Sequence, residues 1–282
     1  MLISPGCIPC IVKQSYTLSR MLGVNDKNLQ SQIIYDTINL LLENKEVPSA
    51  PHFSIKLQSI LNKNLNGYSS FKKIKEKNLL NAKNYLKYLE TMMACAEDKI
   101  EMAVRISITG NTIDLGANPA FDLEKEINEI TSNRLNLDSL GKFKEDLKKA
   151  KRILFIADNY EEALFDKSLI KQLQPKEVVF AVRSNEILND ITLKDAKNLN
   201  IDKLCKVIES GSQIAGTDLE KCTGEFLDFY KSADMVIAKG QGNFETLLNA
   251  ERSIYFLFKI KCEVISEICG FPVGTGILHL KK

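Results

Sequence analysis

One arrangement recurs five times in the second half of the chain: a short apolar run of strand type ends in polar or glycine residues. These runs cover residues 152–157, 178–182, 205–208, 235–238 and 255–258. Helical patterns lie between them, at about 161–173, 193–199 and 219–231. Strands that alternate with helices predict a parallel sheet. We therefore expect an α/β fold with a mostly parallel sheet.

Polar clusters follow the expected strands. Ligands bind outside the carboxyl ends of the strands in an open parallel sheet, so the clusters are expected to converge on one site. Their carboxylates, amides, lysines and glycine-flanked backbone suit a metal ion and a phosphate. The clusters are Asp158-Asn159, Arg183, Asn189-Asp190, Glu209 to Ser212, Lys239 to Asn243, and Lys261.

The first half has a different pattern. Apolar residues at helical spacing fill the first hundred or so positions, with breakers at Gly23, Pro48 and Gly67. We expect an all-helical part over residues 1–105 and an α/β domain over residues 106–282. A helix is expected to break at Gly110-Asn111, and residues from about 119 to 150 are expected to be helical again.

Charge and composition exclude several classes of protein. The net charge of +2, from 38 basic and 36 acidic residues, argues against a dedicated nucleic-acid binder. We expect no membrane span, since no apolar stretch approaches about 18 residues. The start of the chain lacks the features of a signal peptide, which predicts a cytoplasmic location. Only two histidines are present, so the chemistry is expected to rest on carboxylates, amides and lysines.

Each candidate residue has a structural alternative. Asp158 and Asn159 offer hard oxygen ligands for Mg²⁺ or Mn²⁺, and Asp190 offers a second carboxylate. All three are also suited to capping the helices that follow. Arg183 suits bidentate binding of a phosphate or a surface ion pair. The segment from Lys239 to Glu245 brings backbone N–H groups close to an anion, or forms an ordinary strand-to-helix turn.

Seven cysteines without a signal peptide argue against a disulfide scaffold. Cys7 and Cys10 differ from the others because they form a Cys-x-x-Cys pair near the N-terminus. That spacing is half of a zinc site, and no second pair of this spacing exists. Redox chemistry, a metal shared with a distant cysteine, and a purely structural role all stay open.

The ordered set of these motifs resembles the domain-of-unknown-function-89 family, or damage-control phosphatases, in its prokaryotic branch. The resemblance covers nearly the whole chain. It is carried by Cys7 to Cys10, Gly110 to Asp114, Ala157 to Asn159, Leu188 to Thr192, and Ala238 to Glu245. It implies a helical N-terminal part packed on a Rossmann-like α/β domain with helices on both sheet faces.

The resemblance also implies a site and an activity. Similar proteins hold one divalent metal, Mn²⁺, Co²⁺, Ni²⁺ or Mg²⁺, with an Asp-Asn pair and a later Asp, here Asp158, Asn159 and Asp190. They hydrolyse phosphate monoesters of small metabolites, often sugar phosphates. The substrate loop matches Gln241, Gly242, Asn243 and Glu245, next to Lys239 and Gly240. A late phosphate-binding lysine matches Lys261, and Asn111 and Asp114 are candidates for the far side of the crevice.

One departure concerns the residue after the Asp-Asn pair. The family commonly has Asp-Asn-x-Gly-Glu, whereas this chain carries Glu161 in place of the glycine and keeps Glu162. We expect Glu161 either to lie beside the metal, where it changes anion binding, or to point to solvent in the first turn of a helix.

The reaction expected is metal-assisted hydrolysis of a phosphate monoester. Lys261 and the backbone of the Lys239–Asn243 loop would neutralise the phosphoryl group. The nucleophile is either water on the metal or Asp158 itself. One alternative is a protein that binds a metal and a metabolite without turnover. Methyl transfer from S-adenosylmethionine is a weaker alternative, since the turn from Ala157 to Glu161 has no glycine.

Overall fold

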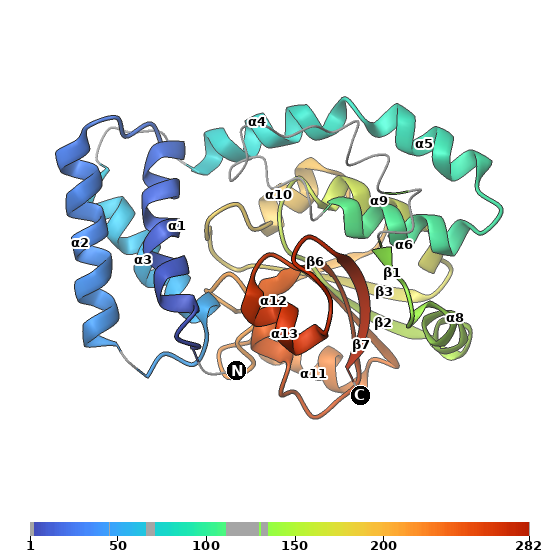
Figure 1. Cartoon of the computed structure of the whole chain (residues 1–282). Helices are drawn as coiled ribbons and strands as arrows, with labels where there is room; N and C mark the ends of the chain where they lie inside the picture. Colours follow the sequence, from blue (N-terminus) through green and yellow to red (C-terminus); the bar gives the residue numbers. More distant parts are fainter. Residues whose placement is uncertain (1–2, 45, 66–70, 111–129, 131–134, 282) are drawn as a thin grey trace.

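The computed structural model describes the chain except for residues 1–2, 45, 66–70, 111–129, 131–134 and 282 (Figure 1). The described helices are α1 (Cys7–Met21), α2 (Lys27–Glu43), α3 (Ala50–Asn64), α4 (Phe71–Lys83), α5 (Leu86–Cys95), α6 (Lys99–Gly110), α8 (Leu140–Lys149), α9 (Ala163–Leu173), α10 (Leu193–Asn198), α11 (Gly224–Ser232), α12 (Gly240–Leu247) and α13 (Glu263–Cys269). The strands are β1 (Leu135–Asn136), β2 (Arg152–Ile156), β3 (Glu177–Val182), β4 (Lys206–Glu209), β5 (Met235–Lys239), β6 (Ile254–Lys259) and β7 (Gly276–Lys281).

The strands form one sheet in the order β1-β7-β6-β5-β2-β3-β4. All neighbours are parallel except β6 and β7, which pair antiparallel. The predicted α/β class with a mostly parallel sheet is confirmed, and β2 to β6 lie where the five apolar runs are. The sequence did not predict β1 and β7. The helix expected over residues 119–150 is wrong at Leu135–Asn136, which is β1, whereas α8 agrees with it.

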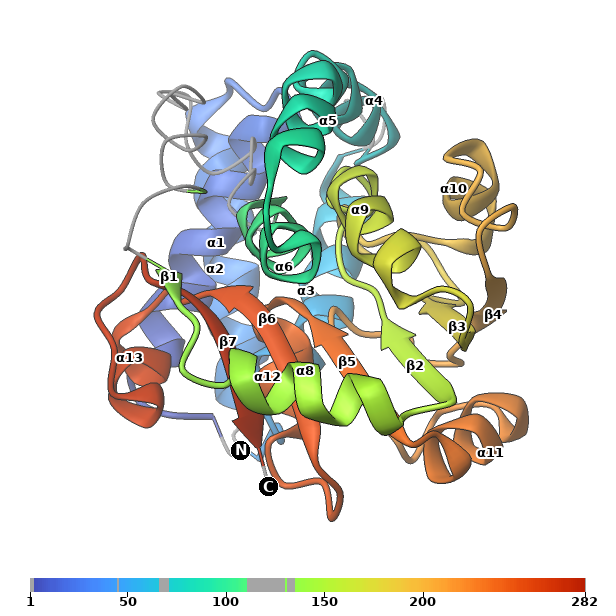
Figure 2. The ribbon, with the colours of Figure 1, turned by 90° about the vertical axis from the view of Figure 1, so that its right-hand side faces the viewer.

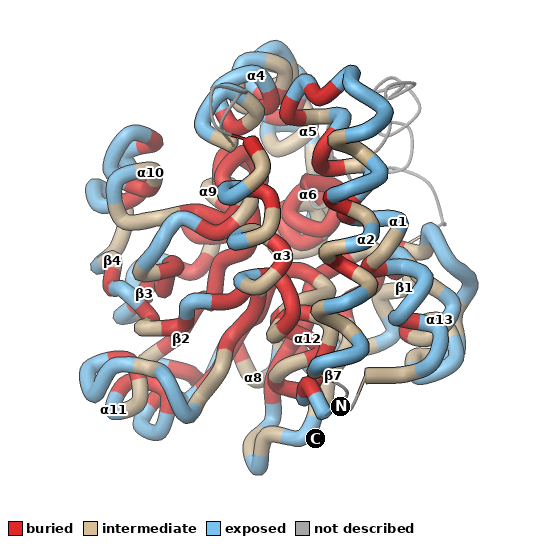
Figure 3. The backbone as a smooth tube through the Cα atoms, turned by 90° about the vertical axis from the view of Figure 1, so that its left-hand side faces the viewer, coloured by how far each residue is buried: buried red, intermediate tan, exposed pale blue. Residues whose placement is uncertain are grey.

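Successive residues of each strand point to opposite faces of the sheet, and helices cover both faces (Figure 2). Phe155 and Phe180 stack, with ring centroids 5.3 Å apart, on the face packed by α5, α6, α8, α9 and α10. Leu154 and Val179 face the opposite side, where α11, α12 and α13 pack. Burial on both faces explains why these strands are near-continuous apolar runs (Figure 3).

The N-terminal helices α1, α2 and α3 pack on one another and enclose a separate hydrophobic cluster around Ile33, Phe53 and Leu57. They stand beside the α/β part in Figure 1, and α4 and α5 extend from them across its top. Helix α4 touches both cores, because Ile74 packs on the N-terminal cluster and Ala82 belongs to the core under the sheet. The predicted domain limit at residue 105 falls inside α6 and stays a prediction.

Helix α6 is described as far as Gly110; the predicted break at Gly110-Asn111 lies at the limit of the described residues and stays a prediction. Asn111 and Asp114 lie outside the described residues. In the described part of the chain, each helix is too short or too polar to cross a membrane.

Candidate active site

The Asp-Asn pair lies where β2 ends, at the carboxyl edge of the sheet. The 187–191 turn runs alongside it: Asn159 and Asp190 form an isolated antiparallel bridge, and the Ile191 N–H donates to the Asp158 carbonyl at 2.8 Å. This backbone pairing places the three predicted metal ligands together, although Asp190 is more than thirty residues away in sequence. All three side chains are largely buried.

Arg183, at the end of β3, is buried beside the two aspartates. Its Nε donates to Asp190 Oδ2 at 2.7 Å, and one terminal nitrogen lies 3.8 Å from Asp158 Oδ1. The same guanidinium donates to Asn243 Oδ1 at 3.1 Å and to Thr217 Oγ1 at 3.3 Å. We call Asp158, Asn159, Asp190 and Arg183 the aspartate cluster. In the described structure Arg183 holds the carboxylates together, and a role in phosphate binding stays a prediction.

Gly240, the first residue of α12, packs directly on Asp158. An added Cβ at this position would lie 1.9 Å from Asp158 Oδ2, and Gly240 also has a φ of +80°. Only glycine satisfies both conditions without strain. The glycine therefore allows the N-terminus of α12, with its free backbone N–H groups, to come up against the aspartate cluster.

Lys239 was predicted to bind substrate, but the structure places its side chain in the interior. Its Nζ donates to Asp166 Oδ1 at 2.7 Å and to the Ser107 carbonyl at 2.8 Å, and lies 3.4 Å from Glu162 Oε2. Ser107 Oγ also donates to Asp166 at 2.6 Å. We call these four residues the lysine cluster. Burial alone would lower the pKa of Lys239, but the carboxylates of Asp166 and Glu162 outweigh it and raise the pKa.

Glu162 joins the two clusters. One of its oxygens accepts a hydrogen bond from Asn159 Nδ2 at 2.7 Å, and the other faces Lys239. With its nitrogen held by Glu162, the Asn159 amide is left with its oxygen as a potential ligand. The sequence assigned no role to Glu162, Asp166 or Ser107. Two signals were available: Glu162 matches the Glu of the family's Asp-Asn-x-Gly-Glu pattern, and Glu162, the N-cap of α9, lies four residues before Asp166.

Glu161, which stands where the family commonly has glycine, is fully buried and does not point to solvent. Its Oε1 accepts hydrogen bonds from Asn78 of α4 and from Asn189, each at 3.0 Å. The expectation that Glu161 is a solvent-facing residue of the first helical turn is therefore wrong. The side chain ties α4 to the turn that carries Asp190.

The helical part also holds the loops around the aspartate cluster. Gln58 of α3 donates to the Glu186 carbonyl and accepts from the Leu188 N–H, at 3.0 and 2.8 Å. Ser54 accepts from the Ala215 N–H at 3.0 Å. These contacts extend the site beyond the α/β part, since α3 positions both the turn that carries Asp190 and the 211–218 loop.

The remaining predicted substrate residues lie around α12. Asn243 is buried and donates to the carbonyls of Ala157 and Lys239, at 3.0 and 2.7 Å. An added Cβ at Gly242 would lie 2.1 Å from the Ala215 carbonyl, so Gly242 allows the loop to pack on α12. These positions build the framework of the site, and direct contact with a substrate stays a prediction for both.

Gln241, Glu245 and Lys261 form the outer end of this region. Gln241 donates to Glu245 Oε1 at 2.9 Å and accepts from the Lys261 N–H at 2.8 Å. Lys261 is exposed, and its positive charge acts to lower the pKa of Asp158. The predicted role of Lys261 in phosphate binding stays a prediction. Asn111 cannot be placed, because it lies outside the described residues.

The electrostatics of the aspartate cluster favour a bound cation. Burial raises the pKa of Asp158 well above its ordinary value, and the carboxylates of Glu162 and Asp190 raise it further, against Arg183 and Lys261. Burial also raises the pKa of Asp190, although Arg183 opposes it. A divalent cation beside these carboxylates would favour their charged form and so offset the effect of burial on both pKa values.

The donor set fits a hard divalent metal ion. It consists of two carboxylates and one amide oxygen, which are ligands that Mg²⁺ and Mn²⁺ accept. Among the described residues, no three His, Cys, Asp or Glu side chains are arranged to hold a metal, so the amide of Asn159 is needed beside Asp158 and Asp190.

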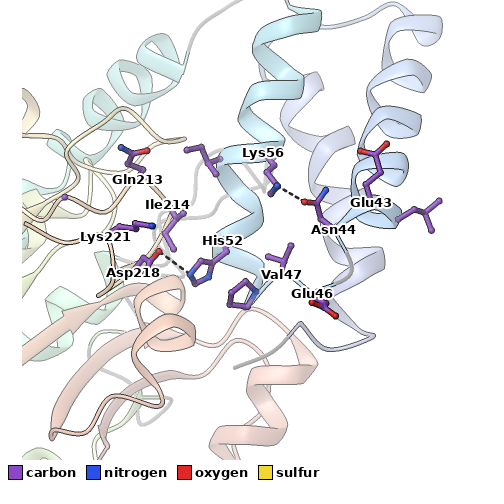
Figure 4. A pocket seen from close by; sticks show the side chains of 14 residues that line it. Glu43, Asn44, Glu46, Val47, His52, Lys56, Gln213, Ile214, Asp218 and Lys221 are labelled. Carbon is purple, nitrogen blue, oxygen red and sulfur yellow. Dashed lines mark hydrogen bonds and ion pairs between the residues drawn. The ribbon is translucent and has the colours of Figure 1, made fainter.

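A cavity of about 810 Å³ lies between the α2–α3 connection and the 211–221 loop (Figure 4). His52 lies 3.8 Å from Asp218 in its wall, and Lys56 donates to Asn44 at 2.7 Å. Its described lining includes Ile214 and Asp218 but none of the predicted metal ligands. The 211–218 loop thus contacts the cavity through these residues and the aspartate cluster through Thr217.

Comparison with known proteins agrees with this architecture. Residues 3–277 match the model of the damage-control phosphatase ARMT1-like domain. An uncharacterized protein of Methanocaldococcus jannaschii is 34% identical over 98% of this chain and 94% of its own. A damage-control phosphatase of Pyrococcus horikoshii is 38% identical over 64% of this chain and 65% of its own, and one of Archaeoglobus fulgidus is 25% identical over 98% of both chains.

The solved structures show the same relationship. The crystal structure of a DUF89 family protein from Pyrococcus horikoshii covers 100% of both chains, with a TM-score of 0.86 and 29% sequence identity. The fold, a mostly parallel sheet with helices on both faces and an N-terminal helical part, is shared with this DUF89 structure. This chain belongs to the damage-control phosphatase ARMT1-like family, also called DUF89. The predicted family resemblance is confirmed.

Proposed function

We propose that this chain is a metal-dependent phosphatase that hydrolyses phosphate monoesters of small metabolites, including damaged ones. Membership of the damage-control phosphatase family and the relatives that bear this name support the phosphatase reading. The observation that carries the metal dependence is the pairing of the Asp190 turn with the end of β2, which brings two carboxylates and an amide into one buried cluster.

The candidate residues have different proposed roles. Asp158, Asn159 and Asp190 would hold one divalent metal, Mn²⁺, Co²⁺, Ni²⁺ or Mg²⁺, which supplies a Lewis acid for the phosphoryl group when it is bound. The N-terminus of α12, brought close by Gly240, offers backbone N–H groups to the phosphate oxygens. Lys261 adds a positive charge from the exposed side.

Further residues keep these groups in place. Arg183 keeps the two carboxylates together, and Glu162 orients the Asn159 amide through its nitrogen. Lys239 holds Glu162 from behind, so its proposed role is positioning rather than contact with the phosphate. Outer contacts of this kind typically change metal affinity about 10–100-fold.

The test is a phosphate-release assay on metal-stripped protein with an aryl phosphate and a panel of phosphorylated metabolites. Mg²⁺, Mn²⁺, Co²⁺ and Ni²⁺ are added back one at a time. We expect at least one metal to restore release, and Asp158→Ala to abolish it while the folded state persists. Asp228→Ala, an exposed aspartate on α11, is the matched control and should behave like wild type.

Two outcomes would contradict the proposal. Full phosphatase activity in Asp158→Ala would show that Asp158 is not a ligand of a metal that the reaction needs. Silence with every metal, in folded protein that still binds a phosphorylated metabolite by calorimetry, would indicate a binding protein without turnover.

A further inference from the structure

The turn over residues 187–191, which carries Asp190, has a strained backbone. Leu188 has a φ of +47°, in the left-handed region where the Cβ of a residue other than glycine meets its own backbone. Such a conformation persists only where the surrounding structure holds it, and it is common at functional sites. The contacts that hold this turn therefore decide where Asp190 lies.

The N-terminal helices hold Leu188 at both its backbone and its side chain. Its N–H donates to Gln58 Oε1 of α3 at 2.8 Å, and Gln58 Nε2 donates to the Glu186 carbonyl at 3.0 Å. The Leu188 side chain packs on the hydrophobic cluster that α1, α2 and α3 enclose. One glutamine thus binds the start of the turn twice, and the strained residue is anchored in a core that lies outside the sheet.

The next residue, Asn189, is connected to α4 through Glu161. The Asn189 side chain donates to Glu161 Oε1 at 3.0 Å, and Asn78 of α4 donates to the same oxygen, also at 3.0 Å. Glu161 and Asn78 are buried, so these hydrogen bonds are shielded from water. The residue directly before Asp190 is therefore joined to the helical part by a single carboxylate oxygen.

Helix α4 also reaches the other side of the turn, through Lys75. Lys75 is 5% exposed, and its Nζ donates to Asp195 Oδ2 at 2.8 Å. The same oxygen accepts from the N–H and the hydroxyl of Thr192, the N-cap of α10, at 3.1 and 2.8 Å. Thr192 lies two residues after Asp190. The helical part is thus connected to the chain on both sides of this aspartate.

We propose that the helical part, α1 to α5, keeps Asp190 in position for the metal, with Gln58 and Glu161 as positioning residues. Gln58 acts on Leu188, and Glu161 acts on Asn189. The inference rests on the proposed function, because it concerns the metal that the aspartate cluster would hold. It makes the metal affinity of the site depend on hydrogen bonds between the helical part and the α/β part, in the way that outer contacts adjust other metal sites.

Metal binding and these hydrogen bonds are then coupled. If loss of the helical contacts weakens metal binding, metal binding strengthens those contacts by the same factor, because the coupling between two equilibria is reciprocal. The Leu188 N–H exchanges with solvent only when its bond to Gln58 opens. We therefore expect Mn²⁺ to slow hydrogen exchange over residues 186–190 in the wild type.

The experiment compares metal-stripped wild type with Gln58→Ala, which removes both hydrogen bonds to the turn. Calorimetry measures Mn²⁺ affinity, phosphate release measures turnover at saturating Mn²⁺, and mass spectrometry measures hydrogen exchange over residues 186–190. We expect the affinity of Gln58→Ala to fall about 10-fold. Its turnover at saturating Mn²⁺ should stay close to wild type, and exchange in the metal-free variant should be faster.

Gln30→Ala is the matched control. Gln30 is a half-buried glutamine of α2, and its side chain donates to the Val24 carbonyl at 2.8 Å, within the helical part. The substitution removes the same chemical group from the same part of the chain without touching the turn. It should leave Mn²⁺ affinity, turnover and exchange over residues 186–190 unchanged.

Two substitutions of Glu161 separate positioning from packing. Glu161→Ala removes the acceptor that Asn78 and Asn189 share and should weaken Mn²⁺ binding. Glu161→Gln keeps a side-chain oxygen for both amides and should bind Mn²⁺ more tightly than Glu161→Ala. Urea unfolding of the metal-free proteins identifies any variant that does not fold, and Gln58→Ala then decides the result, since its hydrogen bonds lie nearer the surface.

The outcomes distinguish this inference from the proposed function. A wild type that binds no Mn²⁺ would contradict the proposed function and, with it, the inference. Equal Mn²⁺ affinities for wild type and Gln58→Ala would contradict the inference alone. An equal loss of affinity in Gln30→Ala would show that the helical part acts through general stability, which would also overturn it.

Discussion

The aspartate cluster and the lysine cluster lie side by side at the same edge of the sheet, and they differ in how closely the cation contacts its two carboxylates. Lys239 has a carbonyl and two carboxylates as partners, and it is fully buried. In the aspartate cluster, Arg183 faces two carboxylates whose pKa values are raised by burial. Each cluster therefore holds one cation against two carboxylates, but Lys239 lies within 3.4 Å of both of its carboxylates, whereas Arg183 lies 3.8 Å from Asp158. We infer that the tightly paired lysine cluster serves as support, and that Asp158 is the carboxylate better placed to accept a further cation.

Glu162 is the point where the two clusters meet. It contacts Asn159 on one side and Lys239 on the other. We therefore expect substitutions in the lysine cluster mainly to lower the stability of the fold. Substitutions in the aspartate cluster should mainly lower the phosphatase activity.

The largest effect is expected for Lys239→Met, which keeps the length of the side chain but removes the charge. Glu162 and Asp166 would then be buried without their cation, and breaking a buried pair in this way costs about 3–5 kcal/mol. Urea unfolding of the metal-free protein measures it. Lys231→Met, an exposed lysine on α11, is the control and should change stability by less than about 0.5 kcal/mol. An equally small loss of stability for Lys239→Met would contradict the supporting role of the lysine cluster.

Asp158→Asn should show the opposite pattern. Phosphatase activity should fall on the order of 10³-fold, because a charged ligand is lost where the phosphoryl charge is stabilised. The free energy of unfolding of the metal-free protein should rise, by about 1 kcal/mol, since a buried carboxylate crowded by Glu162 and Asp190 is removed. Initial rates of phosphate release and urea unfolding, both measured on the same sample, test the two expected changes. Lower stability together with retained activity would contradict the role of Asp158 as a metal ligand.

The pH dependence of stability tests the electrostatics of the lysine cluster through Asp166. Burial, offset by Lys239, raises the pKa of Asp166 from 3.8 to about 6. The folded state thus holds this proton when the unfolded state has released it. Stability from this group is present below about pH 4 and is lost as pH rises through about 6. Relative to Asp166→Asn, wild type should lose about 3 kcal/mol over this range. A constant difference between the two unfolding curves would argue against the shift.

The smallest effect is expected for Glu162→Gln, which leaves the shape of the side chain and removes its charge. The amide of Asn159 loses its charged acceptor, and metal affinity should fall about 10–100-fold. Activity titrated with Mn²⁺ gives the affinity. Glu225→Gln, an exposed glutamate on α11, should leave the midpoint unchanged. An unchanged midpoint for Glu162→Gln would mean that the lysine cluster does not support the metal site.

The α/β fold could be predicted because burial on both faces makes each parallel strand an apolar run with a polar end. β1 and β7 escaped the prediction: β1 has two residues, and β7 ends in partly exposed residues at the edge of the apolar pattern. The three metal ligands were found from motifs, and their contacts came from backbone pairing between the end of β2 and a distant turn. No local sequence pattern indicates the hydrogen bonds of Glu161 or those of Gln58, because these bonds join segments far apart in sequence.

The sequence by itself determined the α/β class, the carboxyl edge as the location of the site, and the residue types that meet there. These depend on strand periodicity and on where polar residues follow apolar runs, which are local properties. The tertiary structure was needed to show that Lys239 turns inward to Glu162 and Asp166 and that Glu161 binds α4. The direction of a side chain at a strand end is set by what packs against it, and those neighbours come from other elements of the chain.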